Sequence, residues 1–117
     1  MPKGSRGGVL NSSTRKRAPR PTTQIGINMR LIETSSFKKT AKDMWDLSVS
    51  RDVGGANILD ETGSSKALRM GLMPTQKLYS MIYWDKDGNM SKRQYFPTLN
   101  DAKYYAKEGL KGIVMGS

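Results

Sequence analysis

One short segment, residues 91–96, interleaves basic and aromatic side chains. It contains Lys92, Arg93 and Tyr95, and the strand-like run before it contributes Tyr83. Cationic and aromatic residues alternating on a small sheet can contact phosphates and stack on bases. We therefore predict that Lys92, Arg93 and Tyr95 contact nucleic acid. An ordinary solvent-exposed strand would show the same pattern, and the sequence leaves both interpretations open.

The first 24 residues carry positive charge and no acidic residue. Gly, Ser, Thr and Pro separate the charges, so the segment cannot bury enough apolar surface to offset the entropy of ordering. We predict a flexible basic arm at residues 1–24 that neutralises phosphates without reading bases. An inert solubilising tail is the alternative. The basic residues of the arm are Lys3, Arg6, Arg15, Lys16, Arg17 and Arg20.

The net charge of the chain is strongly positive. Its 117 residues include 20 Lys and Arg against 10 Asp and Glu, which gives a net charge of +10. Six of these ten excess charges lie in the basic arm, and residues 25–117 carry the remaining four. Such an imbalance makes nucleic acid, DNA or RNA, the expected partner, with the contact concentrated in the arm.

Catalytic and metal-binding residues are scarce. The chain has no Cys and no His, which removes disulfides, the common zinc sites and the usual general base near neutral pH. Asp60 and Glu61 are adjacent carboxylates in an apparent loop, and nothing suggests their burial. Residues 63–66 lack the order of a phosphate-binding loop, and residues 85–88 lack the spacing of a calcium loop. We therefore expect no enzyme activity, no metal and no cofactor.

The basic and aromatic segment is predicted to be half of a hairpin. Residues 78–84 are rich in aromatic and branched side chains typical of a strand. Residues 85–89 contain Asp-Gly, a strong hairpin signal, and residues 90–96 form the return strand. Alternation places the side chains of the first strand on two faces. Tyr79, Met81 and Tyr83 share one face, and Leu78, Ser80, Ile82 and Trp84 share the other.

A helix is expected to follow this hairpin. Pro97 ends the return strand because it cannot donate a hydrogen bond, and Thr98 resembles a helix cap followed by Asp101. Leu99, Ala102, Ala106 and Leu110 fall on one helical face that we expect to pack on the sheet. Gly109 or Gly112 is the predicted end, and residues 113–115 could return as an edge strand.

The N-terminal half of the domain gives weaker signals. Alternating apolar residues predict a strand at residues 24–32. A helix is then predicted from Ser35 or Ser36 to Leu47, with Phe37 and Trp45 on its core-facing stripe. Residues 48–65 contain Gly-Gly and charged residues and are predicted to be a long loop. Residues 67–73 fit either one helical turn or a short strand.

The hairpin and helix resemble the small sheet-plus-helix DNA-binding modules of phage integrase arm domains and plant AP2 domains. The matching features are the loop at residues 85–88, the basic strand at residues 91–96, Pro97-Thr98, and the helix with Ala102 and Ala106. The resemblance covers about residues 78–109. It implies a three-stranded sheet that enters the DNA major groove, and the third strand would come from near residues 67–71.

Together these features predict a small α+β domain with an antiparallel sheet packed against one or two helices. The basic arm occupies residues 1–24 and the domain residues 25–117, with a hairpin-helix unit at residues 78–112. We expect a non-catalytic nucleic-acid-binding protein. The alternative is a structural subunit of a virion, of another large assembly or of a homo-oligomer, whose arm threads between neighbours or touches the genome. No apolar run reaches the length of a membrane helix, so we expect a cytoplasmic or intravirion location.

Overall fold

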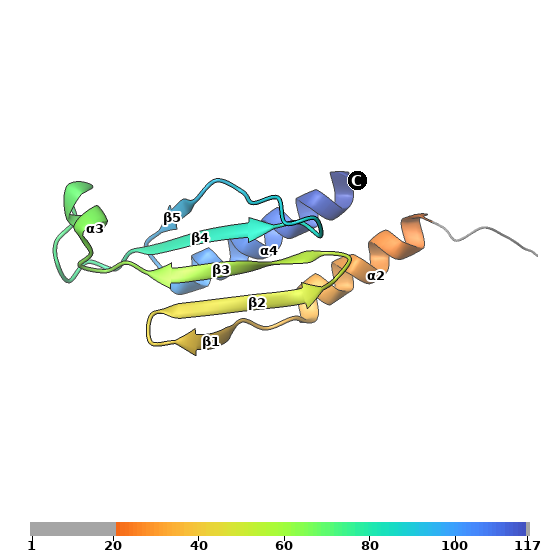
Figure 1. Ribbon diagram of the computed structural model, residues 1–117, viewed down its shortest axis with the longest axis horizontal. Helices are drawn as coiled ribbons and strands as arrows, with labels where there is room; N and C mark the ends of the chain where they lie inside the picture. Colours follow the sequence, from red (N-terminus) through yellow and green to blue (C-terminus); the bar gives the residue numbers. More distant parts are fainter. Residues whose placement is uncertain (1–20, 117) are drawn as a thin grey trace, which may run out of the picture.

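The computed structural model describes residues 21–116, which form one antiparallel sheet of five strands and three helices. This arrangement confirms the predicted α+β class. Figure 1 shows α2 and α4 behind the sheet and the short helix α3 beyond one end of it. In chain order the elements are α2 (Pro21–Thr34), β1 (Lys38–Ala41), β2 (Met44–Ser50), β3 (Gly54–Asp60), α3 (Ser65–Arg69), β4 (Tyr79–Trp84), β5 (Gln94–Phe96) and α4 (Leu99–Gly116).

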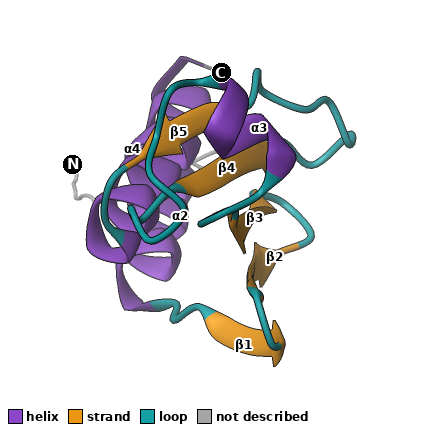
Figure 2. Cartoon of the chain, turned by 90° about the vertical axis from the view of Figure 1, so that its left-hand side faces the viewer, coloured by secondary structure: helices purple, strands orange, loops and turns teal. Residues whose placement is uncertain are grey.

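The strand order in the sheet is the same as the order in the chain, β1-β2-β3-β4-β5. The helix α4 packs on β3, β4 and β5, while α2 packs beside α4 and reaches β2. Figure 2 shows both helices on the same side of the strands. Of the described elements, none packs across the opposite side. We call that side the open face of the sheet.

The helix α4 begins as the sequence predicts and ends later. The backbone N–H of Asp101 donates to Oγ1 of Thr98 at 3.1 Å, as expected of a helix cap. The predicted apolar face is confirmed, since Ala102, Ala106 and Leu110 are buried and Leu99 packs against the core, and Val114 extends this face by one turn. The predicted end at Gly109 or Gly112 is wrong, as is the strand at residues 113–115, because the helix continues to Gly116.

Gly109 has a different role from a helix stop. It lies where the ring of Tyr83 packs on α4, and a Cβ at this position would overlap that ring. The glycine therefore allows the helix and the sheet to approach closely.

The strand predicted at residues 24–32 is wrong, since this segment lies in α2. Ile32 is buried, and Ile25 and Met29 pack against the same core at helical spacing. Ile27 and Leu31, which completed the alternating pattern, are 50% and 37% exposed. The apolar residues thus fit both periods, and packing against α4 selects the helix.

The predicted helix from Ser35 to Leu47 is also wrong. Its residues form β1, a two-residue turn at Lys42 and Asp43, and the first part of β2. Within β2, Trp45, Leu47 and Val49 alternate toward the helices and pack in or against the core. The two-residue period therefore decides the structure here. Trp45 still contacts the core, with its ring edge-on to Tyr79 at a centroid distance of 6.1 Å.

The loop predicted at residues 48–65 contains the central strand β3, so that prediction is wrong as well. Ala56 and Ile58 on β3 are fully buried and face the helices. Gly54 and Gly55 are strand residues rather than breakers. A Cβ at Gly54 would overlap the carbonyl oxygen of Trp84, and one at Gly55 would overlap that of Leu47. Close backbone contacts, not loop formation, require these glycines.

The hairpin of β4 and β5 agrees with the prediction at its first strand and its loop. Gly88 has φ of +84°, as a tight loop requires. The return strand is shorter than residues 90–96, because Met90 makes one bridge to Trp84 and regular pairing resumes only at Gln94. The segment at residues 67–73 begins within α3, so it supplies no third strand. The strand that pairs with β4 on its other side is β3.

A lysine on α4 joins the two long helices. Nζ of Lys107 donates to the carbonyl oxygen of Glu33 in the last turn of α2 at 3.2 Å. It also donates to the carbonyl oxygen of Ser35, just after α2, at 2.6 Å. Partial burial lowers the pKa of this lysine. One turn later, Lys111 forms an ion pair with Glu33 at 3.2 Å. These contacts hold the C-terminal end of α2 on α4.

Candidate nucleic-acid interface

The register of the sheet identifies the side chains on the open face. Residues directly opposite each other in adjacent strands point to the same side. Ser80 pairs with Tyr95, and Trp84 pairs with Gly55. Met81 lies between them in β4, is fully buried and faces the helices. Ser80, Trp84 and Tyr95 therefore point to the open face, as does Ile82.

Two cations are held on the open face near the start of β4. Nη1 of Arg93 donates to Oγ of Ser80 at 3.0 Å, and Nζ of Lys66 donates to the hydroxyl of Tyr95 at 2.7 Å. The same ammonium lies 5.2 Å from the centre of the Tyr95 ring. We call Lys66, Arg93 and Tyr95 the cation cluster. Each of its cations keeps further N–H groups that can donate hydrogen bonds to a phosphate.

The helix α3 and the turn residues before it place Lys66. Oγ of Ser64 accepts a hydrogen bond from the N–H of Ala67 at 3.1 Å and caps the helix. Ala67 is fully buried, which fixes this short helix at the end of the sheet. Lys66 follows Ser65, the first residue of the helix, and extends from it to Tyr95 on β5.

Among the residues predicted to bind nucleic acid, Arg93 and Tyr95 come together and Lys92 stands apart. Lys92 is exposed and lies in the irregular segment between Met90 and β5. Ser91 fixes this segment to β4, since its N–H donates to the carbonyl of Tyr83 at 2.8 Å and its Oγ accepts from the N–H of Tyr83 at 3.0 Å.

Tyr83 and the basic arm are the other features that the sequence links to nucleic acid. Tyr83, which the sequence pattern groups with the residues above, lies on the helix-facing side with its ring against Gly109. The six basic residues of the arm, from Lys3 to Arg20, lie outside the described residues. Residues 21–24, predicted to belong to the arm, form the start of α2.

Sequence reasoning missed Lys66, Trp84 and Arg51 as possible contacts. Alternation along residues 78–84 places Trp84 on the face that does not carry Met81, so the sequence pattern could have indicated Trp84. Lys66 comes to Tyr95 from 29 residues away, and no local pattern indicates such a contact. Arg51 lies in the turn between β2 and β3, and it comes to the same cavity as Trp84 because β3 pairs with β4, which no local pattern indicates.

The other half of the open face carries an acid. Asp46 on β2 accepts hydrogen bonds from Nδ2 of Asn57 at 2.6 Å and from Oγ1 of Thr40 at 2.8 Å. A fixed carboxylate repels phosphates, and it offsets the charge of Lys38, which pairs with Asp46 from β1, so these two residues give no excess positive charge. The favourable part of the open face is therefore the half built from β3, β4 and β5.

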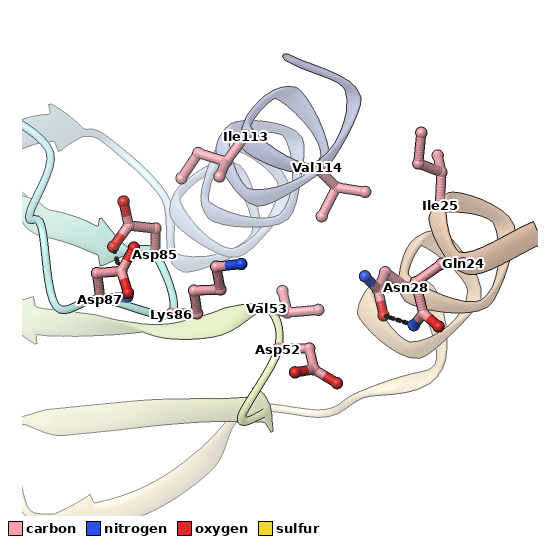
Figure 3. Close-up of a pocket in the computed structure, with 10 residues that line it drawn as sticks. All are labelled: Gln24, Ile25, Asn28, Asp52, Val53, Asp85, Lys86, Asp87, Ile113 and Val114. Carbon is pink, nitrogen blue, oxygen red and sulfur yellow. Dashed lines mark hydrogen bonds between the residues drawn. The ribbon is translucent and has the colours of Figure 1, made fainter. Parts of the chain in front are cut away.

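A separate cavity of about 390 Å³ lies at the end of the domain where α2 and α4 meet two loops. Figure 3 shows Val53 and Val114 on its walls, with Asn28 and Asp52 nearby. Asp85 and Asp87 also line it. Three carboxylates around one cavity disfavour phosphate, so this cavity does not extend the candidate interface.

The carboxylate of Asp85 is occupied within its own loop. Its oxygens accept hydrogen bonds from the N–H groups of Asn89 and Asp87 and from the Asn89 side chain, at 2.9–3.1 Å. The hydrogen bonds from Asn89 do most to lower the pKa of Asp85, desolvation opposes them, and the weaker effects of the Asp87 and Gly88 backbone lower the pKa further. The charge of Asp85 therefore stabilises the loop.

Residues 21–116 contain no cluster of three or more acidic residues placed to hold a metal ion. No helix within the same range is long and apolar enough to cross a membrane. Comparison with protein-family models, with curated proteins and with solved structures found no match.

Proposed function

We propose that this protein is a non-catalytic nucleic-acid-binding protein that contacts the phosphate backbone through its basic arm and its cation cluster. The observation that carries the proposal is the placement of Lys66 and Arg93. Hydrogen bonds to Tyr95 and Ser80 hold both cations on the open face. In the described part of the chain, neither cation is paired with an acid.

Preorganised cations favour this function over a merely solvated surface. A lysine or arginine that is already ordered loses less side-chain entropy when it binds a phosphate. The Arg93 guanidinium still has donors free in a planar fork, which matches a phosphate. The arm would add charge without sequence information, as phosphate contacts do.

The edges of the sheet weigh against the alternative of strand-to-strand assembly. The edge strand β1 carries Lys38 and Lys39 and a register irregularity before Ala41. The opposite edge strand β5 has three residues and is followed by Pro97. Short edges with lysine, bulges or proline resist pairing with another chain. A subunit that assembles by other surfaces stays an alternative, and the binding experiment distinguishes it.

Exchanging Lys66 and Arg93 together for alanine is expected to lower the slope of log affinity against log salt by about 1.4 to 1.8, with about 0.7 to 0.9 per phosphate contact. The loss should be similar for unrelated sequences, because phosphates look alike at every base. Fluorescence anisotropy with labelled single-stranded and duplex DNA and RNA, across a salt series, measures this slope.

The matched control exchanges Arg30 and Lys103 for alanine, which removes one arginine and one lysine from α2 and α4, on the side away from the open face. Equal losses in the two double variants would show that overall charge, not the cation cluster, determines binding. If the wild-type protein binds no nucleic acid at low salt, the proposed function is wrong and the assembly-subunit alternative replaces it.

A further inference from the structure

A second cavity lies on the open face, at the end of β4 opposite the cation cluster. Its volume is about 390 Å³, within the roughly 300–1,000 Å³ of typical small-ligand sites. The turn between β2 and β3 and the loop between β4 and β5 form its walls, and both lie at the right-hand end of the sheet in Figure 1. Its lining residues include Ser50, Arg51, Gly54, Trp84 and Lys86.

Trp84 supplies an aromatic surface to this cavity. A Cβ at its strand partner Gly55 would lie 3.0 Å from Cζ2 and 3.2 Å from Cε2 of the indole. The indole therefore lies close over the glycine backbone, and this contact restricts its orientation. Trp84 remains partly exposed, which leaves aromatic surface available to a ligand.

Two cations flank the aromatic surface. Arg51 and Lys86 are exposed, and within residues 24–116 neither side chain has an ion pair or hydrogen bond. Lys86 lines both this cavity and the one in Figure 3, so it stands between them. Asp85 also lines this cavity, and its carboxylate oxygens accept hydrogen bonds from Asp87 and Asn89.

We propose that this cavity binds one base of a single-stranded nucleic acid, stacked on Trp84, with Arg51 and Lys86 at the neighbouring phosphates. The proposal rests on the proposed function and names its substrate class. In a duplex both faces of each base are already stacked, so only an unpaired base offers a face to the indole.

The position of the cavity relative to the cation cluster supports a strand that follows β4. Ser80, beneath the cluster, and Trp84 are four residues apart on one face of β4, which corresponds to about 13 Å. A single strand laid along β4 would meet Lys66 and Arg93 first and the aromatic cavity next. Asp46 lies on β2, to one side of this path.

The test compares Trp84→Leu with Ile82→Ala, a matched loss of apolar side chain from the same face of β4. The probes are a labelled twelve-nucleotide oligothymidine, an oligouridine of the same length and a twelve-base-pair duplex. Trp84→Leu should weaken binding of the single strands about 5- to 150-fold, as loss of one stacked base does, and change duplex affinity less than twofold. Ile82→Ala removes no aromatic ring and should weaken single-strand binding far less than Trp84→Leu does.

Intrinsic fluorescence keeps the proposal testable if Trp84→Leu does not fold. The chain has two tryptophans, so Trp45→Phe leaves Trp84 as the reporter, and oligothymidine should quench it. Absent quenching, or equal losses for single strands and duplex, would overturn the aromatic site. If binding still depends on Lys66 and Arg93 in that case, the proposed function stands without it. If no probe binds the wild type, both proposals fail.

Discussion

Removing residues 1–20 is expected to reduce the salt dependence of nucleic-acid binding more than any single substitution in the sheet. The deleted segment contains six basic residues and no acid. Each phosphate neutralised contributes about 0.7 to the salt slope on single strands and about 0.9 on duplex, so six contacts contribute roughly 4 to 5. Between 50 and 200 mM salt, such a slope corresponds to an affinity change of about 300- to 1,000-fold.

The truncated chain must begin at Pro21 and keep residues 21–24. Residues 21–24 start α2, and Nε2 of Gln24 donates to Oδ1 of the buried Asn28 at 3.1 Å. Circular dichroism should show the same thermal transition before and after truncation. A variant with the six basic residues changed to glutamine keeps the length of the segment and isolates its charge. A full slope in either variant would show that the arm does not contact phosphate.

Gly54→Ala is expected to give the largest loss of stability among single glycine substitutions in the sheet. Gly54 has φ of +115°, where a side chain is strained, and its Cβ would overlap the backbone carbonyl of Trp84. Strain at such a residue costs about 1–3 kcal/mol, and overpacking against a fixed neighbour costs a further 1–3 kcal/mol or so. The midpoint of urea unfolding should fall accordingly.

Substitutions at two other glycines distinguish the cost of backbone strain from the cost of steric overlap. Gly71 has φ of +87° with nothing within 4 Å of an added Cβ, and Gly112 is an exposed helical residue that also has open space around it. Gly71→Ala should cost about 1 kcal/mol from backbone strain alone, and Gly112→Ala should stabilise α4 by up to about 1 kcal/mol. If Gly54→Ala resembles Gly71→Ala, the close contact with Trp84 does not limit stability.

The C-terminal unit was predictable because its signals are local and agree with one another. Thr98 caps α4, Ala102 and Ala106 face the sheet at four-residue spacing, and the Asp-Gly loop closes a hairpin. In the N-terminal half the prediction failed where the same apolar residues fit both the strand period and the helix period. Ile25 and Met29 suit a strand with Ile27 and a helix with Ile32, and only packing on α4 decides between them.

The candidate interface was predictable in part for a related reason. Alternation along β4 and the sequence of residues 91–96 placed Tyr95 and Arg93 in a sheet, and Arg93 extends onto Ser80. Lys66 and Arg51 depend on where α3 and the turn after β2 lie, and these positions follow from tertiary packing. The pair Gly54-Gly55 suggests a break when the sequence is considered alone. The reason for these glycines is close contact with the backbone of Trp84 and Leu47, and the sequence does not indicate that contact.

The sequential strand order also bears on how fast the molecule folds. Each strand pairs with the strand before it in the chain, so most pairings close short loops, and short loops carry a low entropic cost. The contact between α2 and α4 is the exception, because it joins segments from opposite ends of the described chain. The meander is thus expected to form in the transition state, and the two helices to dock afterwards. Shortening Lys107, which joins them, should then accelerate unfolding in stopped-flow experiments and leave the folding rate nearly unchanged.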